Sequence, residues 1–174
     1  GGDLGLRRAL ALEDGHEPLD ALDEDGARAL AAYRAAGGRR ATSSATVLDL
    51  GAVEAYPGGA WVERVHTLVE ARDERAVDRV GEVAVPEGAV LLEARTVKQD
   101  GRVLEPEEPL GDKRTLSLTG LEPGDLAEWI WIRAVPARGA AVPGFSADPF
   151  FFRADEPLWR SIYTAAAPRG LGLE

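Results

Sequence analysis

The sequence predicts a mainly β protein, namely an antiparallel β-sandwich with one or two short helices at its N-terminus. First, short β-prone segments follow one another from residue 46 onward, separated by turn residues about every ten positions. Second, the glycines and prolines of this part lie between those segments, where chain reversals need them. Third, alanine and leucine at helical spacing are concentrated in residues 1–37, so helices are expected only there.

The strongest helix signals lie in residues 25–37. Asp25 is a suitable N-cap, the following alanine-rich stretch favours a helix, and Gly37 suits the left-handed residue after its end. Residues 4–12 have a similar pattern and predict a second, earlier helix. We therefore expect residues 1–37 to form a helical linker or the tail of a preceding helical repeat region, and residues 38–174 to form the antiparallel β-sandwich domain.

Nine segments of the remaining chain are β-prone, and the best local pattern among them is an alternation of hydroxyl and leucine side chains in residues 115–119. Because successive side chains of a strand point to opposite faces, Leu116 and Leu118 are predicted to be buried and Thr115 to face solvent. Strands are predicted over residues 46–55, 61–71, 81–85, 90–98, 102–104, 115–119, 127–135, 150–153 and 159–165.

Turn chemistry supports these boundaries. The Asp100-Gly101 pair stands between two β-prone runs and tolerates the positive φ that a tight hairpin requires. A Pro-Gly pair fits the central positions of a type II turn, because proline presets the first φ and glycine supplies the second. The residues assigned to turns are Pro57, Gly58, Asp100, Gly101, Pro123, Gly124 and Asp125.

Composition excludes several functions. The 174 residues include 20 Lys and Arg against 30 Asp and Glu, and the net charge of −10 repels nucleic-acid phosphates and anionic lipids. No run approaches the roughly 20 apolar residues of a membrane helix. From the charge and the lack of such a run, we expect this segment neither to bind nucleic acid nor to insert into a membrane. The absence of cysteine removes disulfides, thiolate nucleophiles and cysteine metal ligands.

The search for catalytic chemistry finds only two histidines, His16 and His66, and no serine elbow for a triad. Their separation matches no zinc motif, and His66 in a predicted strand is typical of a histidine packed against a sheet. A loop with four acidic residues offers oxygen ligands to calcium, but prolines and a glycine interrupt it, so we expect a solvated turn. We therefore expect no catalytic residue, metal site or cofactor. The four acidic residues are Glu105, Glu107, Glu108 and Asp112.

Aromatic residues are the candidates for binding. Trp129 and Trp131 are two positions apart and point to one face of a predicted strand, while Ile130 and Ile132 point to the other. One interpretation is a central strand that is covered on both faces. The alternative is an exposed apolar patch that docks a neighbouring domain or a ligand. The candidate binding residues are Trp129, Trp131, Phe151 and Trp159.

Four motifs between residues 56 and 168 carry a resemblance to a known family. They are "YPGG", "VPEGAVLLEARTVKQDGRVLEP", "LSLTGLEPGDLAEWIWI" and "FFFRADEPLWRSIYTAAAP". Together they resemble the bacterial β-domain of unknown function that precedes transglutaminase-like domains. The most specific match is Leu121 with Pro123-Gly124-Asp125, followed by the strand residue Glu128. Another is the strand and hairpin of residues 94–101, where Gln99 stands in place of a frequent proline.

The resemblance implies a non-catalytic accessory or binding module of a larger bacterial protein, at the periplasm or cell envelope. Such a module positions or serves a following transglutaminase-like domain with a cysteine peptidase fold, so its partner is a neighbouring domain of the same polypeptide. The alternative is a free-standing domain that recognises a peptide or glycan at the cell envelope. A small hydrolase that uses carboxylates is a third hypothesis. Tetratricopeptide repeats sometimes precede the family, but the two predicted helices recur too closely for that roughly 34-residue period.

Overall fold

The computed structural model describes residues 9, 11–38, 42–57, 59–106, 114–136 and 157–168. Several predictions lie wholly or largely outside these residues: the helix over residues 4–12, the strand over residues 150–153, the turn residue Gly58, the aromatic residue Phe151 and three of the four acidic loop residues.

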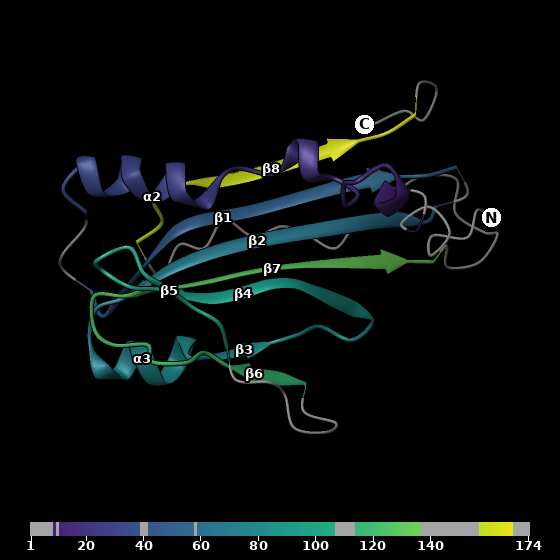
Figure 1. Cartoon of the computed structure of the whole chain (residues 1–174). Helices are drawn as coiled ribbons and strands as arrows, with labels where there is room; N and C mark the ends of the chain where they lie inside the picture. Colours follow the sequence, from purple (N-terminus) through teal and green to yellow (C-terminus); the bar gives the residue numbers. More distant parts are fainter. Residues whose placement is uncertain are drawn as a thin grey trace.

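A six-stranded sheet is the centre of the molecule (Figure 1). Its strand order is β5-β4-β7-β2-β1-β8. A second sheet contains only β3 and β6. The strands are β1 (Ser44–Ala55), β2 (Trp61–Ala71), β3 (Glu82–Ala84), β4 (Ala89–Val97), β5 (Val103–Leu104), β6 (Thr115–Ser117), β7 (Leu126–Val135) and β8 (Ser161–Ala166).

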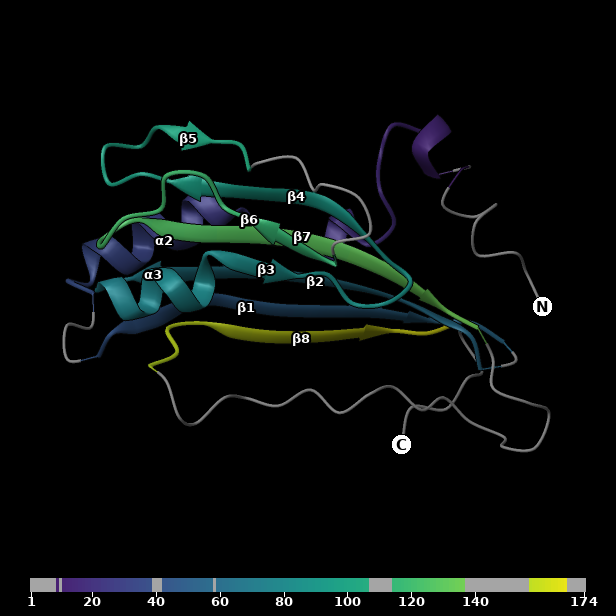
Figure 2. The ribbon, with the colours of Figure 1, turned by 90° about the horizontal axis from the view of Figure 1, so that it is seen from below.

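The prediction of a mainly β protein is confirmed, but the antiparallel sandwich is present only in part. Strands β1 and β8 are parallel, whereas the other named strand pairs of the described residues are antiparallel. Local turn signals predict antiparallel hairpins between consecutive strands, whereas a parallel pair needs a long crossover that such signals do not reveal. The second layer is also mixed, because the small sheet lies beside a helix over the large sheet (Figure 2).

The helix predicted in residues 25–37 is α2 (Gly26–Ala35), which follows the one-turn 3₁₀ helix η1 (Asp20–Leu22). The side chain of Asp25 accepts hydrogen bonds from the backbone N–H groups of Ala27 and Arg28, and Gly37 has a φ of 84°. Both end signals of this helix are therefore confirmed.

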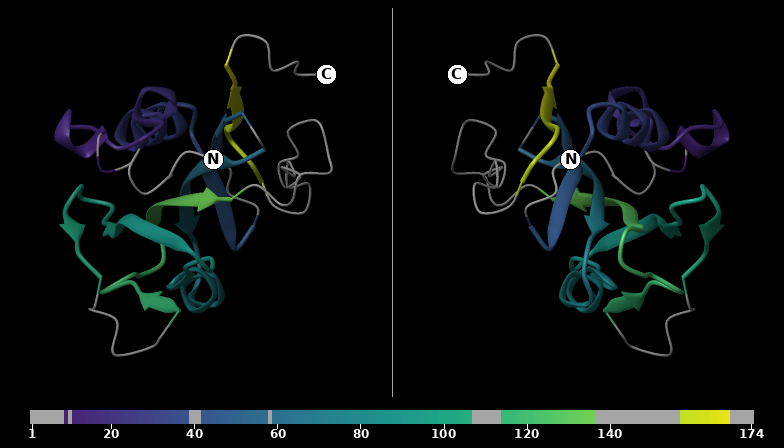
Figure 3. Two further views of the ribbon diagram at one scale, coloured as in Figure 1. Left: turned by 90° about the vertical axis from the view of Figure 1, so that its right-hand side faces the viewer. Right: turned by 90° about the vertical axis from the view of Figure 1, so that its left-hand side faces the viewer.

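A third helix, α3 (Glu74–Val80), corrects the expectation that helices occur only at the N-terminus. Its seven residues are too few to show a helical period in the sequence. The carboxylate of Asp73 caps it by accepting from the N–H of Ala76, and Ala76 and Val80 are buried. End views show α2 and α3 on opposite sides of the large sheet (Figure 3).

Helix α2 lies within the predicted linker, residues 1–37, yet its inner side belongs to the core. Ala29, Leu30 and Tyr33 are buried against β1 and β2, in a cluster that includes Leu50 and Leu68. The division of the chain after residue 37 stays a prediction, but α2 contributes to the core of the sheet domain. The other side of the sheet has its own apolar cluster under α3 and the small sheet, with members such as Val69, Val83 and Leu116.

The turn residues act locally as expected. Gly101 and Gly124 have φ values of 88° and 95°, which glycine adopts at no steric cost. Asp125 accepts hydrogen bonds from the N–H groups of Gln99 and Glu122, and so holds the corner before β7. Leu116 and Leu118 are buried and Thr115 is exposed, which confirms the alternation in this segment.

Candidate functional site

The most polar part of the interior is centred on His66, which lies in β2 on the α2 face of the large sheet. Its side chain is only 2% exposed. The Nδ1 atom is 2.8 Å from a carboxylate oxygen of Asp23, and Nε2 is 3.0 Å from one of Glu128. Burial opposes the charged imidazole, but the hydrogen bonds and negative charges of the two carboxylates outweigh it and raise the pKa of His66 to about 9. His66 is therefore an imidazolium at neutral pH.

Strand geometry explains why these groups meet. Alternate residues of β2 face α2, so Arg64 and His66 point to the same side. Asp23 comes from the short connection between η1 and α2, and its Oδ2 accepts from the Nε and Nη2 of Arg64 at 2.7 and 2.6 Å. Burial alone would raise the pKa of Asp23, but the hydrogen bonds and positive charges of His66 and Arg64 lower it. Asp23 is thus a carboxylate held between two cations.

Glu128 of β7 is the carboxylate that contacts His66 on the side opposite Asp23. Its side chain is 2% exposed, and Oε2 accepts from the Nε of Arg95 at 2.6 Å. Arg95 stands directly opposite Glu128 on the neighbouring strand β4. Burial would raise the pKa of Glu128, but His66 and Arg95 lower it. We call Asp23, Arg64, His66, Arg95 and Glu128 the buried ionic network.

Gly26, the first residue of α2, allows the helix to lie against this network. A Cβ atom at this position would come within 2.1 Å of Glu128 Oε1, which is far closer than atoms approach in real structures. The absence of a side chain at residue 26 therefore lets α2 cover the carboxylate.

The chemistry of the network is that of a structural connection. An imidazolium that donates from both nitrogens has no lone pair with which to accept a proton, so His66 lacks the property that a general base requires. The carboxylates of Asp23 and Glu128 are already hydrogen-bonded to His66 and an arginine. The network joins the segment before α2 to the two central strands β2 and β7.

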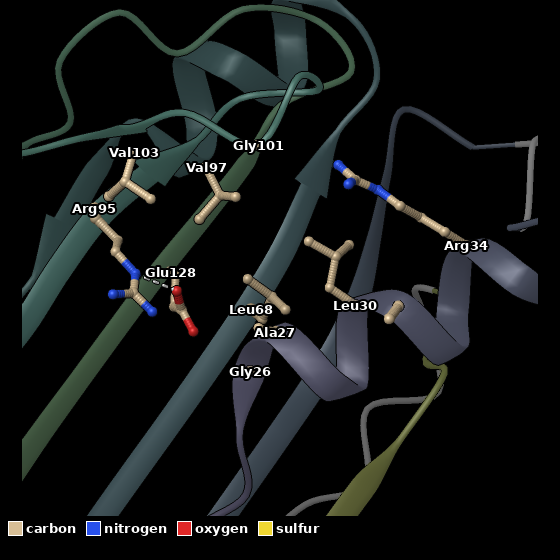
Figure 4. Close-up of a pocket in the computed structure, with 11 residues that line it drawn as sticks. Gly26, Ala27, Leu30, Arg34, Leu68, Arg95, Val97, Gly101, Val103 and Glu128 are labelled. Atoms are coloured by element: carbon tan, nitrogen blue, oxygen red, sulfur yellow. Dashed lines mark hydrogen bonds and ion pairs between the residues drawn. The ribbon is translucent and has the colours of Figure 1, made fainter.

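A cavity of about 320 Å³ adjoins the network between α2, the sheet and the β4–β5 hairpin (Figure 4). The cavity is lined by three charged side chains, those of Arg34, Arg95 and Glu128. The remaining side chains of its wall are apolar: Ala27, Leu30, Ala31, Leu68, Val97 and Val103.

The predicted tryptophan pair lines a different cavity, of about 390 Å³, on the α3 face. Trp129 and Trp131 point to the same side, as expected, and the guanidinium of Arg133 lies 5.8 Å from the ring centre of Trp131. Both tryptophans are half-buried. This cavity also contains polar side chains, including those of Thr67 and Glu82.

Trp159 does not join this pair. Its ring packs edge to face against Tyr33 of α2, with ring centres 5.8 Å apart. Trp159 therefore lies on the α2 face of the large sheet, whereas the cavity lined by Trp129 and Trp131 is on the α3 face. The three candidate binding residues that the structure describes, Trp129, Trp131 and Trp159, therefore do not form one patch. Pro57, Asp100, Gly101, Pro123, Gly124 and Asp125 lie in the connections between strands and are not members of the network, although Gly101 lines the cavity beside it.

The motif residues of the family resemblance are also structural. Lys98 Nζ contacts Asp125 Oδ2 at 2.5 Å, Glu122 Oε2 at 2.6 Å and the carbonyl oxygen of Gly120 at 2.9 Å. Asp125 therefore stabilises both its own turn and a buried lysine on the neighbouring hairpin. Arg95 and Glu128, from the same two motif segments as Lys98 and Asp125, belong to the buried ionic network.

Sequence reasoning missed the partners in this network. The available signal was the face on which three polar residues lie: at alternate positions, Arg64 and His66 share a face of β2 with Val62 and Leu68, and Glu128 shares a face of β7 with Leu126 and Ile130. Such residues are buried only when they are paired, so they indicate mutual contacts. The partner Asp23, by contrast, lies in a connection that carries no distinguishing pattern.

Within the described ranges, no three or more His, Cys, Asp or Glu side chains are arranged to hold a metal ion. No helix in the part of the chain that the structure describes is long and apolar enough to cross a membrane.

Comparison with known proteins identifies no matching family model, and no curated protein matches. One similar solved structure is titled the crystal structure of a "putative protease" from Parabacteroides distasonis. It is 16% identical with a TM-score of 0.44, and the match covers 57% of this chain. This chain spans 24% of the length of that protein.

Proposed function

We propose that this chain is a non-catalytic accessory module of a larger bacterial protein, and that it positions or serves a following transglutaminase-like domain. The observation that carries the proposal is the state of His66, whose two ring nitrogens are both hydrogen-bonded to carboxylates in the interior. Because the chain also has no cysteine, it offers no thiolate for transglutaminase-like chemistry. The partner in this proposal is a neighbouring domain of the same polypeptide at the cell envelope.

The internal roles of the motif residues support the same proposal. Asp125 holds a corner, and Arg95 and Glu128 join two strands, so each of these three motif residues stabilises the scaffold. Motif residues that stabilise a rigid scaffold suit a module whose task is to hold another domain in place.

The test uses the full-length protein and a version that lacks residues 1–174. We expect the truncated protein to keep a nucleophilic cysteine that iodoacetamide still labels, while its thermal stability or its choice of substrate is impaired. A full-length protein without a cysteine, histidine and acid constellation would refute the proposal. So would hydrolase or transferase activity in residues 1–174 that is lost in His66→Gln.

A second candidate is recognition of a peptide or glycan, which the cavity lined by Trp129 and Trp131 favours. Aromatic faces beside polar groups suit sugars and extended peptides. Cell-wall glycan fragments and short peptides are titrated while tryptophan fluorescence is followed. We expect a change that Trp131→Ala removes and Trp159→Phe retains. No change with any ligand would reject this candidate.

A further inference from the structure

We propose that the apolar cavity between α2 and the sheet binds a small monocarboxylate with a linear apolar body (Figure 4). The body occupies the cavity, and the carboxylate lies at Arg34. The volume of the cavity, about 320 Å³, is at the lower end of the range for small-molecule sites. This inference goes beyond the proposed function and does not depend on it.

The walls of the cavity favour an apolar body. Leu30 and Leu68 approach from the helix and the sheet, and Val97 and Val103 come from β4 and β5. Val103 is 47% exposed, so a ligand in the cavity would cover apolar surface that is otherwise in contact with water. Each buried CH₂ group is expected to strengthen binding about fourfold.

The charges around the cavity decide which end group fits. Figure 4 shows Arg95 and Arg34 toward opposite ends of the cavity, with Leu30 and Leu68 between them. Arg95 already contacts the carboxylates of Glu128 and Glu93, so a further anion there meets two negative charges. Arg34 is exposed and has no ion-pair partner among the residues that the structure describes. A carboxylate is therefore placed at Arg34, and an ammonium group is disfavoured there.

The first measurement is a titration of the full chain with octanoate at neutral pH, followed by amide chemical shifts and calorimetry. We expect saturable binding with shifts at residues of α2 and at Val97 and Val103. Hexanoate, which is two CH₂ groups shorter, is expected to bind about fifteenfold more weakly. Octylammonium has the same apolar body with the opposite charge and should bind more weakly than octanoate.

Two matched pairs of variants locate the site. Ala31→Trp fills the cavity from the exposed side of α2 and is expected to abolish octanoate binding, whereas Ala32→Trp makes the same change at the next exposed residue, which does not line this cavity. Arg34→Gln is expected to weaken octanoate binding about threefold, in keeping with an exposed ion pair. Arg28→Gln removes another exposed arginine of α2 and should leave binding unchanged.

Three results would overturn the proposal, provided that circular dichroism shows each variant folded. They are the absence of saturable octanoate binding, equal affinity for octanoate and octylammonium, and equal losses in Ala31→Trp and Ala32→Trp. Shifts confined to the tryptophan cavity would overturn it as well, because they would place the ligand on the other face of the sheet.

Discussion

The two faces of the large sheet are stabilised in different ways. The α2 face buries Arg64, His66 and Glu128 among apolar neighbours, whereas the α3 face is packed with apolar side chains such as Val69 and Val83. The two environments alternate residue by residue along β2 and β7, because successive side chains point to opposite sides. The α2 face therefore depends on a complete set of charges in addition to its apolar cluster, whereas the cluster on the α3 face depends on the volume of its side chains.

The physical difference is that buried charges are costly unless every partner is present. Removing one member leaves the others desolvated without compensation, while an apolar core loses only the contacts of the atoms removed. Removing a charge from the buried ionic network should therefore cost more and depend on pH, whereas truncating an apolar side chain on the α3 face should cost less and be independent of pH.

The largest effect is expected from Glu128→Ala. It leaves the imidazolium of His66 and the guanidinium of Arg95 without their shared carboxylate, which should lower the free energy of unfolding by about 3–5 kcal/mol. Chemical denaturation measures this loss. Glu122→Ala is the matched control, because Glu122 also forms an ion pair but its side chain is 73% exposed, and its loss should cost at most about 1 kcal/mol. Similar losses in both variants would show that the network contributes little.

The second effect is a loss of stability as pH rises. The pKa of His66 is raised from 6.5 to about 9 in the folded protein, so its contribution is fully present below pH 6.5 and is lost as pH increases toward 9. The shift corresponds to about 3 kcal/mol in the free energy of unfolding. The lowered pKa values of Asp23 and Glu128 act in the opposite sense, and their contributions are lost in acid.

The control for the pH effect is His66→Gln, measured by denaturation at several pH values from 6 to 9.5. In this variant the decline between neutral pH and pH 9 should disappear. A decline of the same size in the variant would assign the pH dependence to other groups.

The third effect is on the opposite face, where Val83→Ala removes buried methyl groups from β3. Val83 is 3% exposed, and the loss should be about 2 kcal/mol in the free energy of unfolding. Because its neighbours in the cluster are apolar, the difference between variant and parent should be the same at pH 6 and pH 9. A pH-dependent difference would mean that the two faces are coupled through the sheet.

The smallest effect is expected from Gly26→Ala, at the point where α2 meets the network. Alanine ordinarily favours a helix over glycine by about 1 kcal/mol. Here the added Cβ would overlap Glu128, so we expect a net loss of about 1–2 kcal/mol in the free energy of unfolding. The same substitution in the Glu128→Ala background should cost less, because the clash is removed. A stabilising Gly26→Ala in the parent would contradict the close contact.

Much of the fold can be predicted from local patterns in the sequence. The N-cap Asp25, the turn glycines Gly101 and Gly124, and the alternation around Leu116 each depend on residues close together in the chain, and each is found where expected. The predicted strand over residues 61–71 has the same bounds as β2. The placement of Trp129 and Trp131 on one face follows from their spacing alone.

Long-range geometry decided the rest. The carboxylates that contact His66 lie 43 and 62 residues away in the chain, and no local pattern pairs His66 with Asp23 and Glu128 among thirty acidic residues. The parallel pairing of β1 with β8 and the cavity beside Arg34 likewise depend on which elements are brought together in space. Short-range preferences specify caps, turns and strand faces. A charge, in contrast, can be buried without a large energetic cost only when the tertiary structure places its distant partners in contact with it.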